Sequence, residues 1–251
     1  MTSTPTAPSW LVDTPLAHRG LHGGSVAENT LPAFAAARDA GFGVELDVQL
    51  TRDGVPVVVH DRDLERLTGR AVRVDRLTAA ELRGLPLVGS PEPVPTLAEV
   101  LDVLGATPVM VECKSLGLRV GRLERVVADL LEPHTGPWCV AGFHPGTARW
   151  FRRHRPEVVR VLTSGPLENL PIPGPVRRRL ASLADLDAAA PHAVSYDLRG
   201  LPTPRTDGWR EAGGTLVTWT VATEEELTRA RRLADNVIFE GVRPRIGGPA
   251  T

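Results

Sequence analysis

Two carboxylates lie two residues apart inside an apolar, strand-like run over residues 44–50. Because side chains alternate along a strand, Glu45 and Asp47 face the same side, about 7 Å apart along the chain. Neighbouring anions on an inward face are costly to bury unless a proton or a cation neutralises them. A hard divalent metal with oxygen ligands meets that need. The alternative is an edge strand with a solvated acidic face.

Short strands alternating with helical segments must position these carboxylates. Asp53-Gly54 predicts a hairpin turn into a return strand over 55–60. Such alternation predicts an α/β protein with a parallel sheet, and eight units in 251 residues predict a single (β/α)8 TIM barrel with a β-hairpin extension after the second strand. We expect one domain over 1–251, with its core at about 14–246. Strands are expected at 16–18, 44–50, 109–112, 138–143, 158–162, 193–196, 216–220 and 236–239, and helices at 29–40, 79–83, 97–104, 120–131, 146–154, 176–189 and 224–233.

Chemistry in such a barrel lies at the C-terminal ends of the strands. The first strand ends at His18-Arg19, and Glu112 and Lys114 share one face at the end of another. An antiparallel hairpin brings His60 opposite Asp47 or within one residue pair of it.

These residues include side chains suited to metal binding, anion binding and proton transfer. Three carboxylates, Glu45, Asp47 and Glu112, suit Ca²⁺ or Mg²⁺. Arg19 and Lys114 can receive an anion. Two histidines, His18 and His60, can act as general acid and base near neutral pH. Together they predict cleavage of a phosphodiester.

Four further residues are candidates for substrate binding. Glu28 and Asn29 either cap the following helix or line the pocket. Phe143 and Trp219 lie near strand ends, where they could pack on the alcohol or glycerol portion of a substrate.

Composition excludes several classes of protein. A net charge of −1 gives no reason to expect nucleic acid or an anionic membrane as a partner. No apolar run has the length of a membrane span, and the first eight residues lack the features of a signal peptide. Only Cys113 and Cys139 are present, too few for a disulfide framework. We therefore expect a cytoplasmic protein without stable membrane association, as a monomer or a homodimer.

The ordered motifs resemble those of the glycerophosphodiester phosphodiesterases. The resemblance implies a TIM barrel with His18 and His60 as the acid/base pair, Glu45, Asp47 and Glu112 as ligands of one divalent metal ion, and Arg19 and Lys114 on the phosphate. The chain departs from the family in carrying Glu240 where an Asp is usual after the last strand. The motifs are His18-Arg19-Gly20, Glu28-Asn29-Thr30, the run 45–54 (ELDVQLTRDG), the run 57–61 (VVVHD), Pro95-Thr96-Leu97, Glu112-Cys113-Lys114 and Trp219-Thr220-Val221.

We therefore expect metal-dependent hydrolysis of a small-molecule glycerophosphodiester to sn-glycerol 3-phosphate and an alcohol. One alternative is a lysophospholipase D or another phospholipase-type phosphodiesterase on the same barrel. An alternative of another class is a catalytically inactive barrel that binds a phosphorylated metabolite. The sequence leaves open the metal, the alcohol, which histidine is the acid, and whether water or the glycerol 2-hydroxyl is the nucleophile.

Overall fold

The computed structural model describes residues 5–115, 120–168 and 172–246. The chain divides into two compact units. The first unit is Leu16–Trp138, and the second combines Met1–Pro15 with Cys139–Thr251. Residues 1–4, which begin the segment that argues against a signal peptide, lie outside the described residues. The expectation of a single domain stays a prediction.

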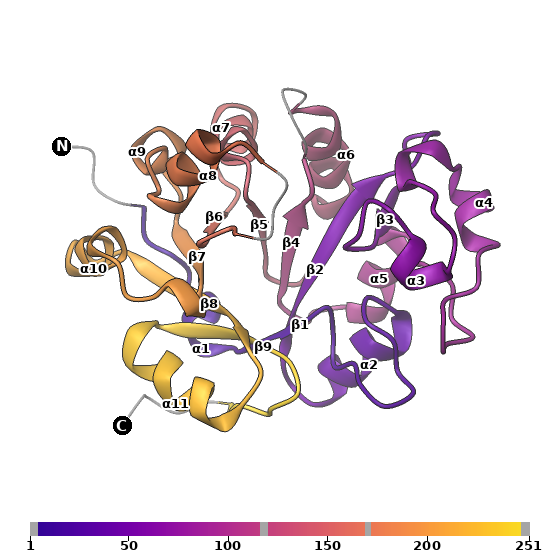
Figure 1. Ribbon diagram of the computed structural model, residues 1–251, viewed down its shortest axis with the longest axis horizontal. Helices are drawn as coiled ribbons and strands as arrows, with labels where there is room; N and C mark the ends of the chain where they lie inside the picture. Colours follow the sequence, from indigo (N-terminus) through magenta and orange to yellow (C-terminus); the bar gives the residue numbers. More distant parts are fainter. Residues whose placement is uncertain (1–4, 116–119, 169–171, 247–251) are drawn as a thin grey trace. The chain divides into compact units, whose positions relative to one another are not determined.

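The first unit is built around the long strand β2 (Figure 1). β2 pairs in parallel with β1 on one side and β4 on the other, and its last three residues pair antiparallel with β3. Its residues are almost all buried, including the polar Glu45, Asp47 and Gln49, which alternate with apolar residues along the strand. The elements of this unit are β1 (Leu16–His18), α2 (Leu31–Asp39), β2 (Gly43–Leu50), β3 (Pro56–Val58), α3 (Glu65–Thr68), η1 (Val74–Arg76), α4 (Ala79–Arg83), α5 (Leu97–Leu104), β4 (Val109–Cys113) and α6 (Arg122–Leu131).

The Asp53-Gly54 turn forms as predicted and produces the β-hairpin extension. Gly54 has φ +86°, a conformation that favours glycine, and its N–H donates to the Thr51 carbonyl at 3.0 Å. The return strand β3 is shorter than the expected 55–60. The Gln49 side chain donates hydrogen bonds to the carbonyls of residues 59–61. These carbonyls therefore bond to a side chain and not to a neighbouring strand.

Threonine caps fix two helices of the first unit. The Thr96 side chain accepts a hydrogen bond from Glu99 N, and the Glu99 carboxylate accepts one from Thr96 N, so α5 begins where the sequence predicts. Thr78 and Glu81 make the same capping box at α4. The segment between β3 and α5 has its own apolar cluster, formed by Val57, Val59, Leu64, Val74, Leu82, Leu87 and Val94.

Gly20, two residues after the end of β1, is a position where the fold should be sensitive to substitution. Its φ is +83°, and a Cβ there would lie 2.7 Å from the Ala33 carbonyl carbon. We expect Gly20→Ala to lower the free energy of unfolding by about 2 kcal/mol through strain and this clash. Gly69→Ala is the matched control, because Gly69 has φ +70° but open space around a Cβ. Equal losses for both variants in urea denaturation would contradict the clash.

The second unit continues the alternation of strands and helices. Its strands β5 to β9 pair in parallel in the order of the sequence, and an apolar cluster in this unit includes Tyr196, Leu216 and Trp209. The elements are α1 (Trp10–Asp13), β5 (Trp138–Gly142), α7 (Pro145–His154), β6 (Arg160–Ser164), α8 (Gly174–Ala181), α9 (Leu186–Ala189), β7 (Ala193–Asp197), η2 (Leu198–Gly200), α10 (Pro204–Glu211), β8 (Thr215–Val221), α11 (Glu224–Leu233) and β9 (Asn236–Phe239).

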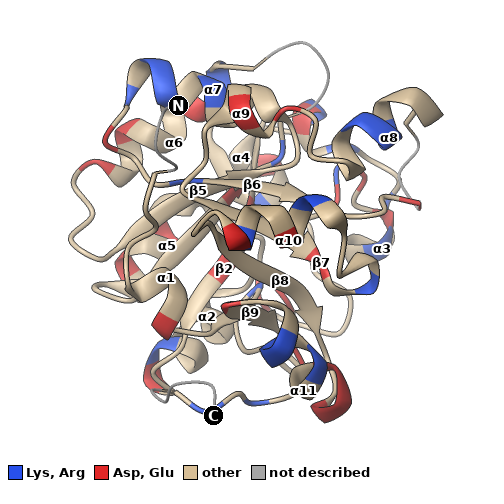
Figure 2. Ribbon diagram, turned by 90° about the vertical axis from the view of Figure 1, so that its left-hand side faces the viewer, with Lys and Arg blue, Asp and Glu red and all other residues tan. Residues whose placement is uncertain are grey.

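Charge placement supports the helices of the second unit. α11 begins with three glutamates and ends with Arg231 and Arg232, a distribution that complements the helix dipole (Figure 2). The single helix expected over 176–189 is wrong, because α8 and α9 are separate. Leu183 breaks the helix with φ +52° while its side chain is buried in the apolar cluster.

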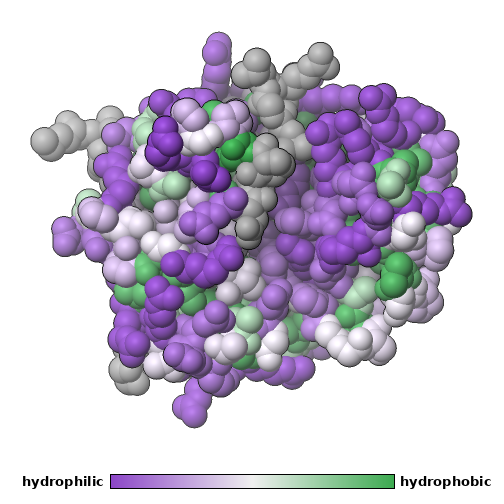
Figure 3. Space-filling model, viewed as in Figure 1, coloured by the Kyte–Doolittle hydropathy of each residue, from purple (hydrophilic) through white to green (hydrophobic). Residues whose placement is uncertain are grey.

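The described residues of the two units together supply the eight parallel strands expected of a (β/α)8 barrel, three from the first unit and five from the second. On the face shown in Figure 3, hydrophilic side chains predominate and apolar ones are scattered. Among the helices of the described residues, none combines the length and the apolar character that a membrane crossing needs.

Candidate active site

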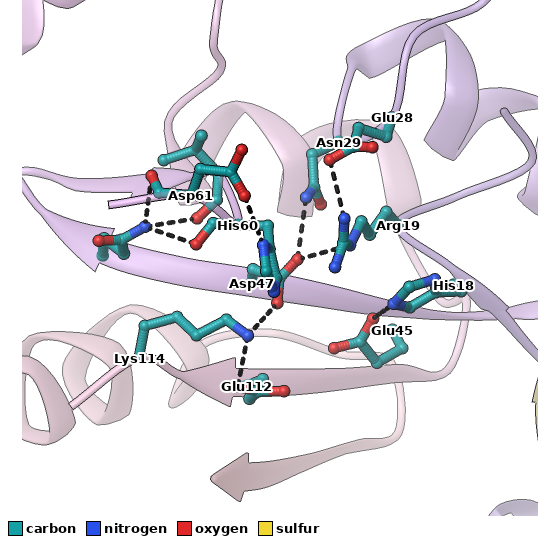
Figure 4. Close-up of polar contacts among 12 residues, drawn as sticks. His18, Arg19, Glu28, Asn29, Glu45, Asp47, His60, Asp61, Glu112 and Lys114 are labelled. Atoms are coloured by element: carbon teal, nitrogen blue, oxygen red, sulfur yellow. Dashed lines mark hydrogen bonds and ion pairs between the residues drawn. The ribbon is translucent and has the colours of Figure 1, made fainter. Parts of the chain in front are cut away.

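Three carboxylates converge in the first unit (Figure 4). Glu45 and Asp47 come from β2 and Glu112 from β4, where Asp47 and Glu112 are direct register partners. One oxygen from each residue lies within 4.8 Å of the others. All three are buried, with exposed fractions of 4%, 1% and 7%. The strand pattern that places Glu45 and Asp47 on one inward face therefore holds.

Asp47 is the best-compensated anion of the cluster. Lys114 Nζ lies 2.8 Å from its Oδ1, and Arg19 Nε and Asn29 Nδ2 lie 3.1 and 3.0 Å from its Oδ2. Burial alone would raise the pKa of Asp47, but the charges of Lys114 and Arg19 hold that pKa well below its usual value. Asp47 is therefore ionised at neutral pH.

The pKa of Glu45 is shifted in the opposite direction from that of Asp47. Burial, followed by the charges of Asp47 and Glu112, raises the pKa of Glu45 well above its usual value. Its Oε2 is buried and accepts no hydrogen bond from the described residues. The orphaned oxygen shows that the protein side chains alone do not satisfy this carboxylate.

A divalent cation fits this donor set. Three buried carboxylates face two permanently charged cations, Lys114 and Arg19, so the cluster has an excess of one negative charge when all three carboxylates are ionised. The oxygen-only donors suit Ca²⁺ or Mg²⁺ rather than a softer metal. Glu45, Asp47 and Glu112 are thus the residues that could hold the metal.

His60 lies beside the carboxylates because of the hairpin. Val59 N donates to the Asp47 carbonyl at 2.9 Å, so His60 is one residue beyond the partner of Asp47, as predicted. Its Nδ1 lies 2.7 Å from Asp61 Oδ1. Because the hydrogen bond with His60 keeps the pKa of Asp61 well below its usual value, Asp61 is an ionised acceptor for Nδ1–H. Nε2 is then the His60 nitrogen that can exchange a proton with a substrate.

His18 ends β1 next to Glu45. Its Nε2 lies 3.9 Å from Glu45 Oε2, and its side chain is 15% exposed. The following residue, Arg19, is fixed by its N–H, which donates to the Glu45 carbonyl at 2.8 Å. Arg19 has φ +56°, a strained conformation for a non-glycine residue. Its Nη1 donates to Glu28 Oε1 at 2.9 Å while its Nε faces Asp47.

Glu28 and Asn29 belong to this network rather than to the helix cap. Glu28 bonds to Arg19 and to Arg66, and Asn29 bonds to Asp47. The N-cap of α2 is Thr30, whose side chain makes no capping hydrogen bond. Neither side chain caps α2, and the contact of Glu28 and Asn29 with substrate stays a prediction.

Nine of the predicted site residues thus lie together in the first unit, and the two aromatic candidates lie in the second. Phe143 and Trp219 contact each other edge to face, with ring centroids 5.6 Å apart and planes at 89°. Their contact with substrate stays a prediction. Glu240 directly follows β9, and its N–H donates to the Val221 carbonyl at 3.0 Å.

The sequence reasoning missed two residues of this network. Gln49 donates to the carbonyls of residues 59, 60 and 61 at 2.9 to 3.0 Å and so holds the backbone of His60. Strand alternation gave a signal for it, because Gln49 shares the face of Glu45 and Asp47. Arg66, on the short helix α3, gave no comparable signal, since its contacts depend on how two loops meet.

The chain is similar in sequence to known proteins. The sequence model of the "Glycerophosphoryl diester phosphodiesterase family" matches residues 18–239. A glycerophosphodiester phosphodiesterase of Caldanaerobacter subterraneus is 37% identical over 129 residues, covering 47% of this chain and 52% of that protein. One of Bacillus altitudinis is 33% identical over 160 residues, covering 59% and 65%. The chain thus spans less than two thirds of these relatives.

Solved structures match over most of the chain. An Oleispira antarctica phosphodiesterase, solved with the product sn-glycerol-3-phosphate, superposes with a TM-score of 0.77 at 22% identity, covering 91% of this chain and 92% of that one. A glycerophosphodiester phosphodiesterase of Thermotoga maritima gives a TM-score of 0.70 at 25% identity, covering 89% and 92%. The predicted (β/α)8 barrel class is confirmed by these likenesses.

Proposed function

Because the chain belongs to the glycerophosphoryl diester phosphodiesterase family, we propose that it hydrolyses glycerophosphodiesters to sn-glycerol 3-phosphate and an alcohol. The observation that carries this proposal is the buried cluster of three carboxylates with Arg19, Lys114 and His60 beside it. A site with both signs of charge and a histidine suits a substrate that is itself an anion. The product bound to the structurally similar Oleispira antarctica phosphodiesterase, sn-glycerol-3-phosphate, supports the glycerol phosphate half of the substrate.

The phosphate would lie between the cations of the site. The Arg19 guanidinium is held by Asp47 and Glu28 through Nε and Nη1, so Nη2 can donate to a phosphate oxygen. Lys114 is held between Asp47 and Glu112 at 2.8 and 2.7 Å. A divalent cation on Glu45, Asp47 and Glu112 would supply further Lewis-acid stabilisation of the charge that develops on the phosphate.

The two histidines would transfer the protons. One would take a proton from the nucleophile, water or the glycerol 2-hydroxyl, and the other would give a proton to the departing alcohol. The P–O bond to the alcohol breaks as the new P–O bond forms. Attack by water gives sn-glycerol 3-phosphate directly, whereas attack by the 2-hydroxyl gives a cyclic phosphate that a water molecule must then open to the same product. His60 would act through Nε2, because Asp61 occupies its Nδ1.

Hydrolysis of glycerophosphocholine tests the proposal. We expect the purified protein with Ca²⁺ or Mg²⁺ to release sn-glycerol 3-phosphate, detected by ³¹P NMR, and to leave glycerol 3-phosphate itself intact, since a monoester lacks the leaving alcohol. No turnover with either metal would refute the proposal and would favour the inactive, phosphometabolite-binding barrel. The cytoplasmic location and the monomeric or homodimeric state stay predictions.

Lysophospholipids are a second candidate substrate class, favoured by a partly apolar cavity in the first unit. The cavity has a volume of about 250 Å³, and its lining combines the charged Glu28 and Arg66 with the apolar Val26, Leu67, Leu87 and Val94. Glu28 links it to Arg19. A higher kcat/KM for lysophosphatidylcholine than for glycerophosphocholine would identify a lysophospholipase D, and the reverse would exclude that alternative.

A further inference from the structure

The guanidinium of Arg66 connects Glu28 and Asp61, two carboxylates beside the site. Arg66, on α3, donates through Nε to Asp61 Oδ2 at 2.6 Å. Its Nη2 and Nη1 donate to the two carboxylate oxygens of Glu28 at 2.7 and 3.2 Å. A single side chain therefore makes three charge-assisted hydrogen bonds to two carboxylates that lie 33 residues apart in sequence, since one is at position 28 and the other at 61.

Each of these carboxylates continues to a residue with a proposed role in the reaction. Glu28 accepts from Arg19 Nη1 at 2.9 Å, and Asp61 Oδ1 lies 2.7 Å from His60 Nδ1. The contacts form an unbroken chain from Arg19 through Glu28, Arg66 and Asp61 to His60. Arg66 is its central member and touches neither end.

The exposure of Arg66 argues that its role is geometric. Its side chain is 53% exposed, and ion pairs at such sites add little to folding stability. Its partners are less exposed, at 17% for Glu28 and 21% for Asp61. The hydrogen bonds with Glu28 and Asp61 raise the pKa of Arg66 above its usual value, so the bridge keeps its positive charge throughout the working pH range.

We propose that Arg66 is a positioning residue that fixes the orientation of Arg19 and His60 relative to each other, through Glu28 and Asp61. The inference rests on the proposed function, in which Arg19 contacts the phosphate and His60 transfers a proton. Misplacing a reacting group by about 1 Å can cost about a hundredfold in rate. A planar fork bonded to two carboxylates holds both at a set separation, which a lysine ammonium cannot reproduce.

Substitution of Arg66 tests the proposal by separating kcat from stability. We expect Arg66→Met to lower kcat for glycerophosphocholine about thirtyfold and to raise KM several-fold, with a melting temperature close to that of wild type. Arg66→Lys should recover part of the loss in kcat. Arg83→Met is the matched control, because Arg83 is 56% exposed and pairs with Glu99, and neither is one of the site residues. The kcat of this variant should stay within twofold of wild type.

A mutant cycle tests whether Arg66 acts through its two partners. In the Glu28→Gln/Asp61→Asn background, adding Arg66→Met should change kcat less than threefold. A full thirtyfold loss in that background would show direct contact with substrate and overturn the positioning role. An Arg66→Met enzyme with wild-type kcat would overturn it too, as would a loss of kcat matched by a loss of folded protein in both Arg66 variants.

The result also separates this inference from the proposed function. A wild-type protein that hydrolyses glycerophosphocholine and is unaffected by Arg66→Met refutes the positioning role alone. A wild-type protein without turnover refutes the proposed function, and the positioning role falls with it.

Discussion

Alanine in place of His60 will lower kcat for glycerophosphocholine about a thousandfold while the protein stays folded. General acid–base catalysis by a positioned side chain contributes about 10² to 10⁴ in rate. The His60 ring is 37% exposed and its main contact is with Asp61, so its removal takes little packing from the core. The melting temperature should therefore stay close to that of wild type, which circular dichroism can check.

His18→Ala should cause a loss of the same size, and the leaving group then distinguishes the two histidines. A p-nitrophenyl ester of glycerol phosphate has a leaving group that departs without protonation. The variant that lacks the general acid should recover much of its activity on this ester, and the variant that lacks the general base should not. The assignment of the pair thus follows from one comparison of two substrates.

A histidine remote from the site provides the control. His154 is exposed on α7 in the second unit and stacks on Trp150, with ring centroids 4.9 Å apart. His154→Ala should leave kcat within twofold of wild type. Retention of a tenth or more of wild-type kcat by both His18→Ala and His60→Ala would rule out the acid/base pair.

Local sequence signals predicted the part of the site that depends on local geometry. Strand alternation placed Glu45 and Asp47 on one face, and the Asp53-Gly54 turn placed His60 beside them. Each of these inferences uses contacts between residues close in sequence or in neighbouring strands. The capping box at Thr96 fixed α5 for the same reason.

Features that depend on contacts between loops were not predictable in this way. Arg66 meets Glu28 across 38 residues, and no periodicity reports where their loops approach. The break between α8 and α9 likewise depends on Leu183, whose burial in the apolar cluster stabilises a left-handed backbone that a leucine would otherwise avoid. Position in a helix-like pattern carries no information on such tertiary contacts.

Glutamine in place of Glu45 will abolish turnover and stabilise the chelated protein. The substitution keeps the shape of the side chain but removes a charge that is buried and 4% exposed. We expect the free energy of unfolding of the chelated protein at pH 8 to rise by about 2 kcal/mol, the order of the cost of an unsatisfied buried polar group. Turnover should fall to background because one of the three carboxylates is lost.

The pH dependence of stability explains why Glu45→Gln should raise the free energy of unfolding. The pKa of Glu45 is raised above its usual value of 4.5, so above pH 4.5 the folded protein keeps a proton that the unfolded chain has released. Stability falls with rising pH wherever the folded state binds more protons. The chelated wild-type protein should therefore lose stability as the pH rises from 4.5 towards the raised pKa, and Glu45→Gln should remove this part of the decline.

Metal addition should make wild type more stable than Glu45→Gln, the reverse of their order when chelated. Ca²⁺ or Mg²⁺ at a hundred times its dissociation constant stabilises a folded protein by about 2.7 kcal/mol. We expect this gain in wild type and in the exposed control Glu132→Gln, and little of it in Glu45→Gln, measured by thermal melting. Full turnover after exhaustive chelation, or an equal gain in Glu45→Gln, would refute the metal site.

The same chemical change two residues away should have the opposite effect on stability. Asp47 pairs with Lys114 and Arg19 and accepts a hydrogen bond from Asn29 Nδ2, and the charges of Lys114 and Arg19 hold its pKa well below the usual value. Asp47→Asn would leave Lys114 and Arg19 without a central anion, at a cost of about 3 kcal/mol in the free energy of unfolding. Removing the charge of these two carboxylates on one face of β2 thus changes stability in opposite directions. Asp47 is neutralised by the protein, whereas Glu45 requires a proton or a bound cation.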